Sequence, residues 1–338
     1  MKKIMFYRPL FSLGGTEIAM LNLMKKLKKY DLYIGYSDAT SDKHLLDRFS
    51  EFATIINITE VKDFEVDVFI TCSAHYNLVD AVKNIKYNKF VLWIHHLINI
   101  KNTVLSNDEE NKNIDYIVTV SNTTANILKS MFPKLNNKIT AIYNVIDDNE
   151  IKEKAKDPIN LSLSNELNLV TVSRVCKEKG FERMIHLAKV LKDNNIDFKW
   201  FIVGGNYYKE EFERIMALYE DYKDNFEWFG FIDNPHNIVR QCDYSVLLSD
   251  DETWGLVLTE AMILGIPCIS SDFDVAFEQI KDNENGIILS NTNYESYKDR
   301  LYDIINNKQK YKNSVSNYVY KIDSIIRKWD DLFNERSN

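Results

Sequence analysis

Two carboxylates eight positions apart are the clearest candidates for chemistry in this sequence. Glu252 follows a predicted strand over residues 244–249, and Glu260 lies at the front of the predicted helix after it. Thr259 could cap that helix and Gly265 could end it. Two carboxylates that converge on one polyhydroxylated ligand could accept hydrogen bonds from ribose and sugar hydroxyls. The simpler alternative for Glu260 is a carboxylate that complements the dipole in a first helical turn.

Two cations follow a second predicted strand. Arg174 lies at the carboxyl end of the strand over residues 167–173, and Lys179 is five residues further on, in the turn before a helix. At a strand end, a guanidinium and an ammonium could grip a diphosphate. They would then neutralise the charge that develops as it leaves. The alternative is a pair of solvated loop cations.

The first half offers a glycine turn and a histidine pair. Gly14 and Gly15 separate the first predicted strand from the first helix, and such N–H groups could meet a phosphate. The alternative is a tight turn without a ligand, since the full Gly-x-Gly-x-x-Gly pattern of dinucleotide binding is absent. His95 and His96 follow the strand over residues 89–94. His95 could hydrogen-bond a sugar hydroxyl, shuttle a proton or simply pack, and no third ligand for zinc is placed nearby.

Strand-like and helix-like segments alternate along the whole chain, which favours βαβ units and parallel sheets. The polar stretch 147–168 separates two such series and is the predicted linker, and residues 313–333 are predicted to form one amphipathic helix. We therefore expect two Rossmann-like α/β domains, over 1–150 and 165–315. Residues 316–338 are expected to cross back to the first. Ligands should bind in a cleft beyond the carboxyl ends of the strands.

Composition narrows the classes of function. The 338 residues carry a net charge of −8, with 18 basic and 18 acidic residues in 1–150, so nucleic-acid binding is not expected. The longest apolar run is about half of the ~20 residues that a membrane crossing needs. One basic cluster, at the end of a predicted helix, is either a solvated helix end or a contact with an anionic membrane surface. It comprises Lys25, Lys26, Lys28 and Lys29.

Several segments together resemble glycosyltransferase family 4, a large retaining family with the GT-B fold. ETWGLVLTEAMILGIPCI resembles that family's Glu-x7-Glu segment, EGFGL…EAMA.G.PVI, and SRVCKEKG resembles its GR….KG segment. GGTE resembles its N-terminal Gly-Gly loop, FIVGG its strand ending in VGdG, and YNVID its NGVD segment. The similarity covers most of the chain and is strongest over 170–290.

The resemblance implies a role for each candidate. Arg174 and Lys179 would bind the diphosphate, Glu260 the ribose, Glu252 the transferred sugar, and His95 the donor sugar or the reacting face. Gly15 would lie beside a phosphate. The segment after the first Glu would also contact the donor, through Thr253, Trp254, Gly255 and Leu256.

This sequence departs from the family pattern in three places. Thr253 replaces a Gly, Asp274-Val275 replaces a Gly-Gly pair, and His96 replaces an Asp. The first two put the backbone approach to the donor in doubt and affect donor choice more than the class of reaction.

The function implied is retaining transfer of a hexose or N-acetylhexosamine from a nucleotide-diphosphate sugar, most often a UDP-sugar. The acceptor would be a glycan, a lipid-linked sugar or a protein, in surface polysaccharide or glycoconjugate synthesis. The enzyme would be cytoplasmic or at the inner face of the membrane. No cofactor or metal is expected, and Asp272-x-Asp274 only imitates a metal signature of another transferase architecture. A catalytically silent GT-B subunit is the alternative, but it should have lost Arg174, Lys179 or a motif Glu.

Overall fold

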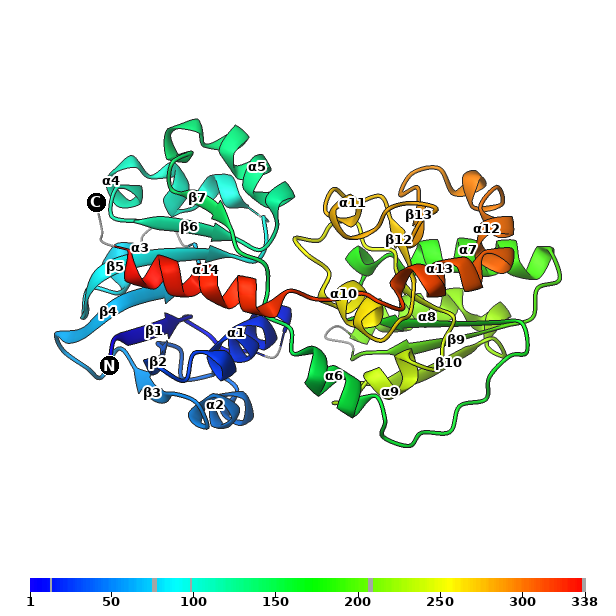
Figure 1. Ribbon diagram of the computed structural model, residues 1–338, viewed down its shortest axis with the longest axis horizontal. Helices are drawn as coiled ribbons and strands as arrows, with labels where there is room; N and C mark the ends of the chain where they lie inside the picture. The colour runs from blue at the N-terminus through cyan, green and yellow to red at the C-terminus, as the bar shows by residue number, and fades with distance from the viewer. Residues whose placement is uncertain (13, 75–77, 98, 206–208, 336–338) are drawn as a thin grey trace. The chain divides into compact units, whose positions relative to one another are not determined.

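The computed structural model describes residues 1–12, 14–74, 78–97, 99–205 and 209–335. Its contacts divide the chain into two compact units, labelled by element in Figure 1. Unit 1 comprises Met1–Ile146 and Lys321–Asn338, and unit 2 comprises Asp147–Tyr320. Each unit is an α/β domain built on a parallel sheet.

Seven described strands form the parallel sheet of unit 1, in the order β3-β2-β1-β4-β5-β6-β7. They are β1 (Lys3–Tyr7), β2 (Asp31–Tyr36), β3 (Thr54–Asn57), β4 (Phe64–Thr71), β5 (Ile85–Ile94), β6 (Tyr116–Thr119) and β7 (Ile139–Ala141). The helices are α1 (Gly15–Lys26), α2 (Lys43–Ser50), α3 (Leu78–Ala81), α4 (Asp108–Asn111), α5 (Asn122–Met131) and α14 (Ile322–Asn334). The central strands are near-continuous apolar runs, as expected where helices cover both faces.

The sheet of unit 2 has six described strands, also parallel, in the order β10-β9-β8-β11-β12-β13. They are β8 (Leu167–Val172), β9 (Phe198–Val203), β10 (Phe226–Gly230), β11 (Tyr244–Leu247), β12 (Cys268–Ser271) and β13 (Gly286–Leu289). The helices are α6 (Asp148–Lys154), α7 (Phe181–Asp193), α8 (Lys209–Leu218), α9 (His236–Val239), α10 (Leu256–Ile263), α11 (Ala276–Gln279), α12 (Leu301–Asn306) and α13 (Lys308–Val315).

Each sheet has one point where the strand order reverses, between β1 and β4 in unit 1 and between β8 and β11 in unit 2. Crevices outside the carboxyl ends of the strands form at such points, and ligands of open α/β sheets bind there. We therefore expect residues that bind a ligand to follow β1, β4, β8 and β11.

The observed elements differ from the sequence analysis in three places. The expected linker contains α6, which Asp147 caps and two i,i+4 ion pairs brace, Lys152–Asp148 and Lys154–Glu150. The expected single helix at 313–333 is two helices, α13 and α14, because residues 316–321 leave helical geometry between them. The sequence analysis also missed β3, an edge strand whose side chains are only partly buried.

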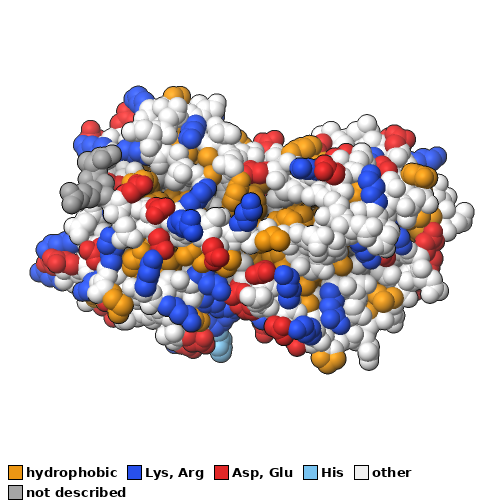
Figure 2. All heavy atoms as spheres, in the orientation of Figure 1, with side chains coloured by type: hydrophobic (Ala, Val, Ile, Leu, Met, Phe, Trp, Pro, Cys, Tyr) orange, Lys and Arg blue, Asp and Glu red, His pale blue; other side chains and the backbone are white. Residues whose placement is uncertain are grey.

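The lysine cluster does not lie on one helix. Helix α1 ends at Lys26, so Lys28 and Lys29 follow it, and Lys29 pairs with Asp330 of α14 at 2.7 Å. Figure 2 shows basic and acidic side chains interspersed on the face it displays. No helix among the described residues is long and apolar enough to cross a membrane.

The C-terminal helix α14 packs on the sheet of unit 1, where Figure 1 shows it in red. Trp329 is fully buried and lies edge-on to Trp93 of β5, with ring centroids 5.0 Å apart. The Lys2 ammonium donates to the Phe333 carbonyl at 2.7 Å, and the Lys89 ammonium donates to the Glu335 carbonyl at 2.7 Å. The last helix is thus an integral part of the first domain.

We expect Trp329→Ala to destabilise unit 1 by about 3–5 kcal/mol, because it empties a site that a large ring fills completely. Urea unfolding followed by far-UV circular dichroism would measure the loss. Lys328→Ala, at the exposed neighbouring position on the same helix, is the matched control and should change stability by less than about 0.5 kcal/mol. Equal effects of the two substitutions would contradict the packing role of Trp329.

Candidate active site

The two loops that carry the strongest sequence candidates meet at the reversal point of unit 2. Strands β8 and β11 are neighbours, with Leu169 opposite Tyr244 and Val170 opposite Ser245. The turn after β8 carries Arg174 and Lys179, and the loop after β11 carries Glu252. Because parallel strands end at the same edge, residues distant in sequence become neighbours there.

Lys179 and Glu252 form a direct ion pair. The Lys179 ammonium lies 2.6 Å from Glu252 Oε1, and the Ser249 hydroxyl donates to the same oxygen at 2.8 Å. Both charged side chains are mostly buried, with 16% and 17% of their surface exposed. An ammonium has three donors, so Lys179 can hold Glu252 and still donate to a second anion.

Arg174 is placed differently from Lys179. Its side chain is 53% exposed, and its Nη2 lies 3.9 Å from Glu178 Oε1, a pair that contributes little to stability. The guanidinium is therefore in the same turn as Lys179 but open to solvent.

Glu260 lies in the second turn of α10, so its predicted position in the first turn is wrong. The helix begins after Gly255, whose φ of +76° favours glycine, which places Glu260 fifth in the helix. The predicted cap by Thr259 is also wrong, since that hydroxyl is buried and donates to Gln279 Oε1 at 2.7 Å. Glu260 Oε2 lies 3.5 Å from His236 Nε2 of α9, and both side chains are largely buried.

The segment between Glu252 and Glu260 is held by hydrogen bonds to the buried side chain of Gln279. Gln279 is buried, receives the Thr259 hydrogen bond and donates its amide to the Trp254 carbonyl. Trp254 itself is 6% exposed. Val275, which stands where the family has a glycine, has an ordinary right-handed backbone and a buried side chain.

At the reversal point of unit 1, a buried ion pair lies beside the Gly14-Gly15 turn. Gly14 precedes α1 in an extended conformation and brings no side-chain cap. Glu17, in the first turn, is 2% exposed and is paired with the Arg8 guanidinium, which follows β1. Burial raises the pKa of the Glu17 carboxyl, while the Arg8 charge and hydrogen bonds from nearby backbone act to lower it.

His95 follows β5 and packs against Trp93, with ring centroids 4.3 Å apart. Burial, the Arg8 charge and the neighbouring His96 together lower the pKa of His95 to about 3. Burial and Arg8 also lower the pKa of His96. Since its pKa lies far below neutrality, His95 is a neutral imidazole at physiological pH and a weak proton acceptor.

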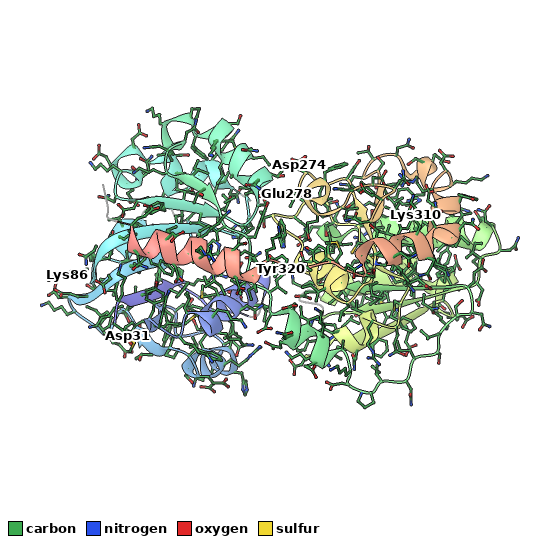
Figure 3. All side chains as sticks on the ribbon, viewed as in Figure 1. Asp31, Lys86, Asp274, Glu278, Lys310 and Tyr320 are labelled. Atoms are coloured by element: carbon green, nitrogen blue, oxygen red, sulfur yellow. The ribbon has the colours of Figure 1, made fainter. Side chains whose placement is uncertain are left out.

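The two aspartates of the Asp-x-Asp imitation do not share a site. Asp272 Oδ1 accepts the Asn291 backbone N–H at 2.8 Å, whereas Asp274 is exposed in the loop before α11, where Figure 3 labels it. Within the described ranges, no group of three or more His, Cys, Asp or Glu side chains is placed to hold a metal ion.

Comparison with protein families identifies the chain. Residues 152–322 match the model of the family described as "Glycosyl transferases group 1". This match spans half of the chain and contains both motif glutamates. The chain belongs to the glycosyl transferases group 1 family.

Curated relatives of this glycosyltransferase match it over part of their length. It is 26% identical over 226 residues to the N-acetyl-alpha-D-glucosaminyl L-malate synthase of Bacillus anthracis, covering 62% of this chain and 58% of the relative. It is 28% identical over 177 residues to the poly(ribitol-phosphate) alpha-N-acetylglucosaminyltransferase of Staphylococcus aureus, covering 48% and 34%. The chain thus spans less than two thirds of the length of the first curated relatives it matches.

Solved structures confirm the expected fold class, two Rossmann-like domains of the GT-B type. The structure of Anabaena Alr3699/HepE in complex with UDP and glucose aligns with a TM-score of 0.76 at 15% identity, covering 98% of this chain and 99% of that one. Staphylococcus aureus TarM, crystallised with UDP, aligns at 0.73 with 14% identity, covering 99% and 100%. At these identities the likeness concerns the fold.

Sequence reasoning missed several residues of this glycosyltransferase that lie at the two reversal points. Two of them, Arg183 near the start of α7 and Glu17 on the buried side of α1, have sequence features that could have identified them. Arg183 is a cation in a first helical turn, where the dipole disfavours it, and Glu17 is spaced with Met20, Leu21 and Met24 on one apolar stripe. His236 left no comparable signal.

We expect His95→Gln to flatten the dependence of unfolding free energy on pH between about 6.5 and 3. An unfolded histidine takes up a proton below about 6.5, whereas folded His95 resists protonation until about pH 3. His95 therefore favours folding above pH 6.5, and this contribution is lost as pH falls, by at most ~1.4 kcal/mol per pH unit.

Urea unfolding at a series of pH values would measure this slope. His44→Gln removes an exposed imidazole on α2 and tests whether the loss of any histidine has the same effect. An unchanged slope in His95→Gln would show that this side chain is not kept neutral by the fold.

Proposed function

We propose that this chain transfers a hexose or N-acetylhexosamine from a nucleotide-diphosphate sugar, with retention of anomeric configuration and without a metal. The Lys179–Glu252 ion pair at the reversal point of unit 2 carries the proposal. It joins a cation suited to a leaving diphosphate with a carboxylate suited to sugar hydroxyls. A UDP-sugar is the proposed donor, because HepE and TarM were crystallised with UDP.

Each site residue has a proposed role. Lys179 and Arg174 neutralise the diphosphate, and one ammonium donor of Lys179 stays on Glu252 to align it on the sugar. Glu260 accepts hydrogen bonds from the ribose hydroxyls. Further donor contacts come from the segment that Gln279 supports and from the turn before α1, through Thr253, Trp254, Gly255, Leu256 and Gly15.

His95 is proposed to hydrogen-bond a sugar hydroxyl rather than to transfer a proton. A neutral imidazole has one donor and one acceptor nitrogen, whereas a group with a pKa of about 3 is a poor base near neutral pH. In the reaction, the bond from the anomeric carbon to the phosphate oxygen breaks and a bond to the acceptor oxygen forms. The acceptor proton passes to the leaving phosphate.

The proposed acceptor is a glycan, a lipid-linked sugar or a protein, in the synthesis of a surface polysaccharide or glycoconjugate. The proposed location is the cytoplasm or the inner face of the membrane. Contact with an anionic membrane surface would be electrostatic, through Lys25, Lys26, Lys28 and Lys29. The apolar side of α1 is already packed into unit 1, so it is not free to insert.

A panel of nucleotide sugars would test the proposal. With excess EDTA present, the expected result is slow hydrolysis of one UDP-sugar and thermal stabilisation by the same compound. The initial product should be the sugar with unchanged anomeric configuration, observed by proton NMR before mutarotation. If no nucleotide sugar stabilised the protein and none was hydrolysed, a catalytically silent subunit would be favoured. Activity that requires added manganese or magnesium would overturn metal independence.

We expect Lys179→Ala to lower kcat/KM by roughly 10²–10³-fold, the range for removal of one preorganised charge-stabilising donor. Arg174→Ala should act in the same direction, and Arg174→Lys should rescue only part of the loss, since an ammonium cannot make a two-pronged contact. Steady-state hydrolysis or transfer would measure these effects.

The matched control is Lys177→Ala, which removes an exposed cation from the same turn and should leave kcat/KM within about threefold. If Lys179→Ala and Lys177→Ala lowered kcat/KM equally, the loss would come from the positive electrostatic potential of the turn as a whole. The specific role of Lys179 would then be contradicted.

A further inference from the structure

Arg183 is a buried cation with no place in the reaction described so far. It is the third residue of α7 and is 7% exposed. Burial of a charge costs several kcal/mol unless it is paired, and a cation in a first helical turn is also disfavoured by the helix dipole. A guanidinium in this position therefore needs strong local partners.

Its partners all belong to the loop after β11. The Nε–H donates to the Leu248 carbonyl at 2.7 Å, and Nη2 donates to Asp250 Oδ1 at 2.5 Å. The backbone N–H of Asp250 in turn donates to the Glu178 carbonyl at 2.8 Å. These bonds join the helix, the loop after β11 and the turn after β8.

Gly180 allows the turn and the loop to approach this closely. A Cβ atom at this position would lie 1.7 Å from the Leu248 oxygen and 2.7 Å from Arg183 Nη2, and the φ of +72° also favours glycine. The contact is therefore backbone against backbone, and Arg183 bonds the Leu248 carbonyl that forms one side of it.

The two loops that Arg183 joins carry the two halves of the proposed catalytic pair. Glu178, whose carbonyl receives the Asp250 N–H, immediately precedes Lys179. On the other loop, Ser249 lies between the two residues that Arg183 bonds, and its hydroxyl donates to Glu252. The Ser271 hydroxyl holds the Ser249 carbonyl from β12, at 2.6 Å.

We propose that Arg183 is a positioning residue for transfer, one that sets the separation between Lys179 and Glu252 without touching the substrate. The inference rests on the proposed function. Loss of the guanidinium would release the 248–252 loop from the turn, and Glu252 would lose its alignment on the sugar. Turnover should then fall more than donor binding, because Glu260 lies on α10, outside this network.

The test uses Arg183→Met, Arg183→Lys and a matched control. Arg300, which directly precedes α12, makes the same kind of contacts as Arg183. Its guanidinium donates to the Ile288 carbonyl at 3.3 Å and to the Asp282 carboxylate at 2.8 Å, and 20% of its side chain is exposed. Arg300→Met thus removes a guanidinium that bridges a carbonyl and a carboxylate, but not between the two catalytic loops.

We expect Arg183→Met to lower kcat by at least about tenfold, within the range that misplacement of a reacting group by about 1 Å can cause. The donor KM should change by less than about threefold. Arg183→Lys should recover part of kcat, since an ammonium can satisfy one of the two partners. Arg300→Met should be destabilised to a similar degree in urea while keeping its kcat.

Hydrogen exchange at the Asp250 amide gives a readout that does not depend on activity. Arg183→Met should accelerate this exchange and Arg300→Met should not. Accelerated exchange together with an unchanged kcat, or equal loss of kcat in both variants, would overturn the positioning role. If wild type hydrolysed no nucleotide sugar, the proposed function would fail with it, whereas unchanged Asp250 exchange in Arg183→Met would contradict the inference alone.

Discussion

The pairing of β8 with β11 is the constraint on which the candidate site depends. It brings together two loops that lie 73 residues apart in sequence and places the Lys179 ammonium 2.6 Å from the Glu252 carboxylate. The strand order reverses at this pair of parallel strands, and a crevice outside the carboxyl ends of the strands forms at such a point. Gly180 then lets the two loops touch backbone to backbone, and Arg183 closes the contact from the helix side.

Each unit has a largely buried ion pair at the point where its strand order reverses. A buried charge there must be paired, because desolvation otherwise exceeds any gain. Unit 2 pairs Lys179 with Glu252, and unit 1 pairs Arg8 with Glu17. The consequence in unit 1 extends beyond the pair, since the Arg8 charge adds to burial in lowering the pKa of His95. Each of these cations thus acts on a neighbouring side chain, Arg8 on His95 and Lys179 on Glu252.

The sequence predicted most of the strands and the residue pairs that follow them, because buried parallel strands are apolar runs that end in polar loops. The helix predicted to follow the turn of Lys179 is α7, which begins at Phe181 directly after Gly180. Edge strand β3 and helix α6 were missed because one is half-buried and the other depends on a cap and ion pairs. The bond from Arg183 to Leu248 could not be predicted, since Leu248 offers only its backbone carbonyl, which every residue has.

Neither Glu252 nor His95 is well suited to serve as the base for the acceptor in the proposed reaction. Glu252 Oε1 already accepts hydrogen bonds from Lys179 and Ser249, so this oxygen is not free to take a proton. His95 is a weak base, because burial and Arg8 oppose its protonation. In the proposed reaction the diphosphate, once its bond to the sugar lengthens, would then be the stronger proton acceptor. Lys179 would then have two effects, since it lowers the energy of the leaving charge and holds the Glu252 carboxylate in place.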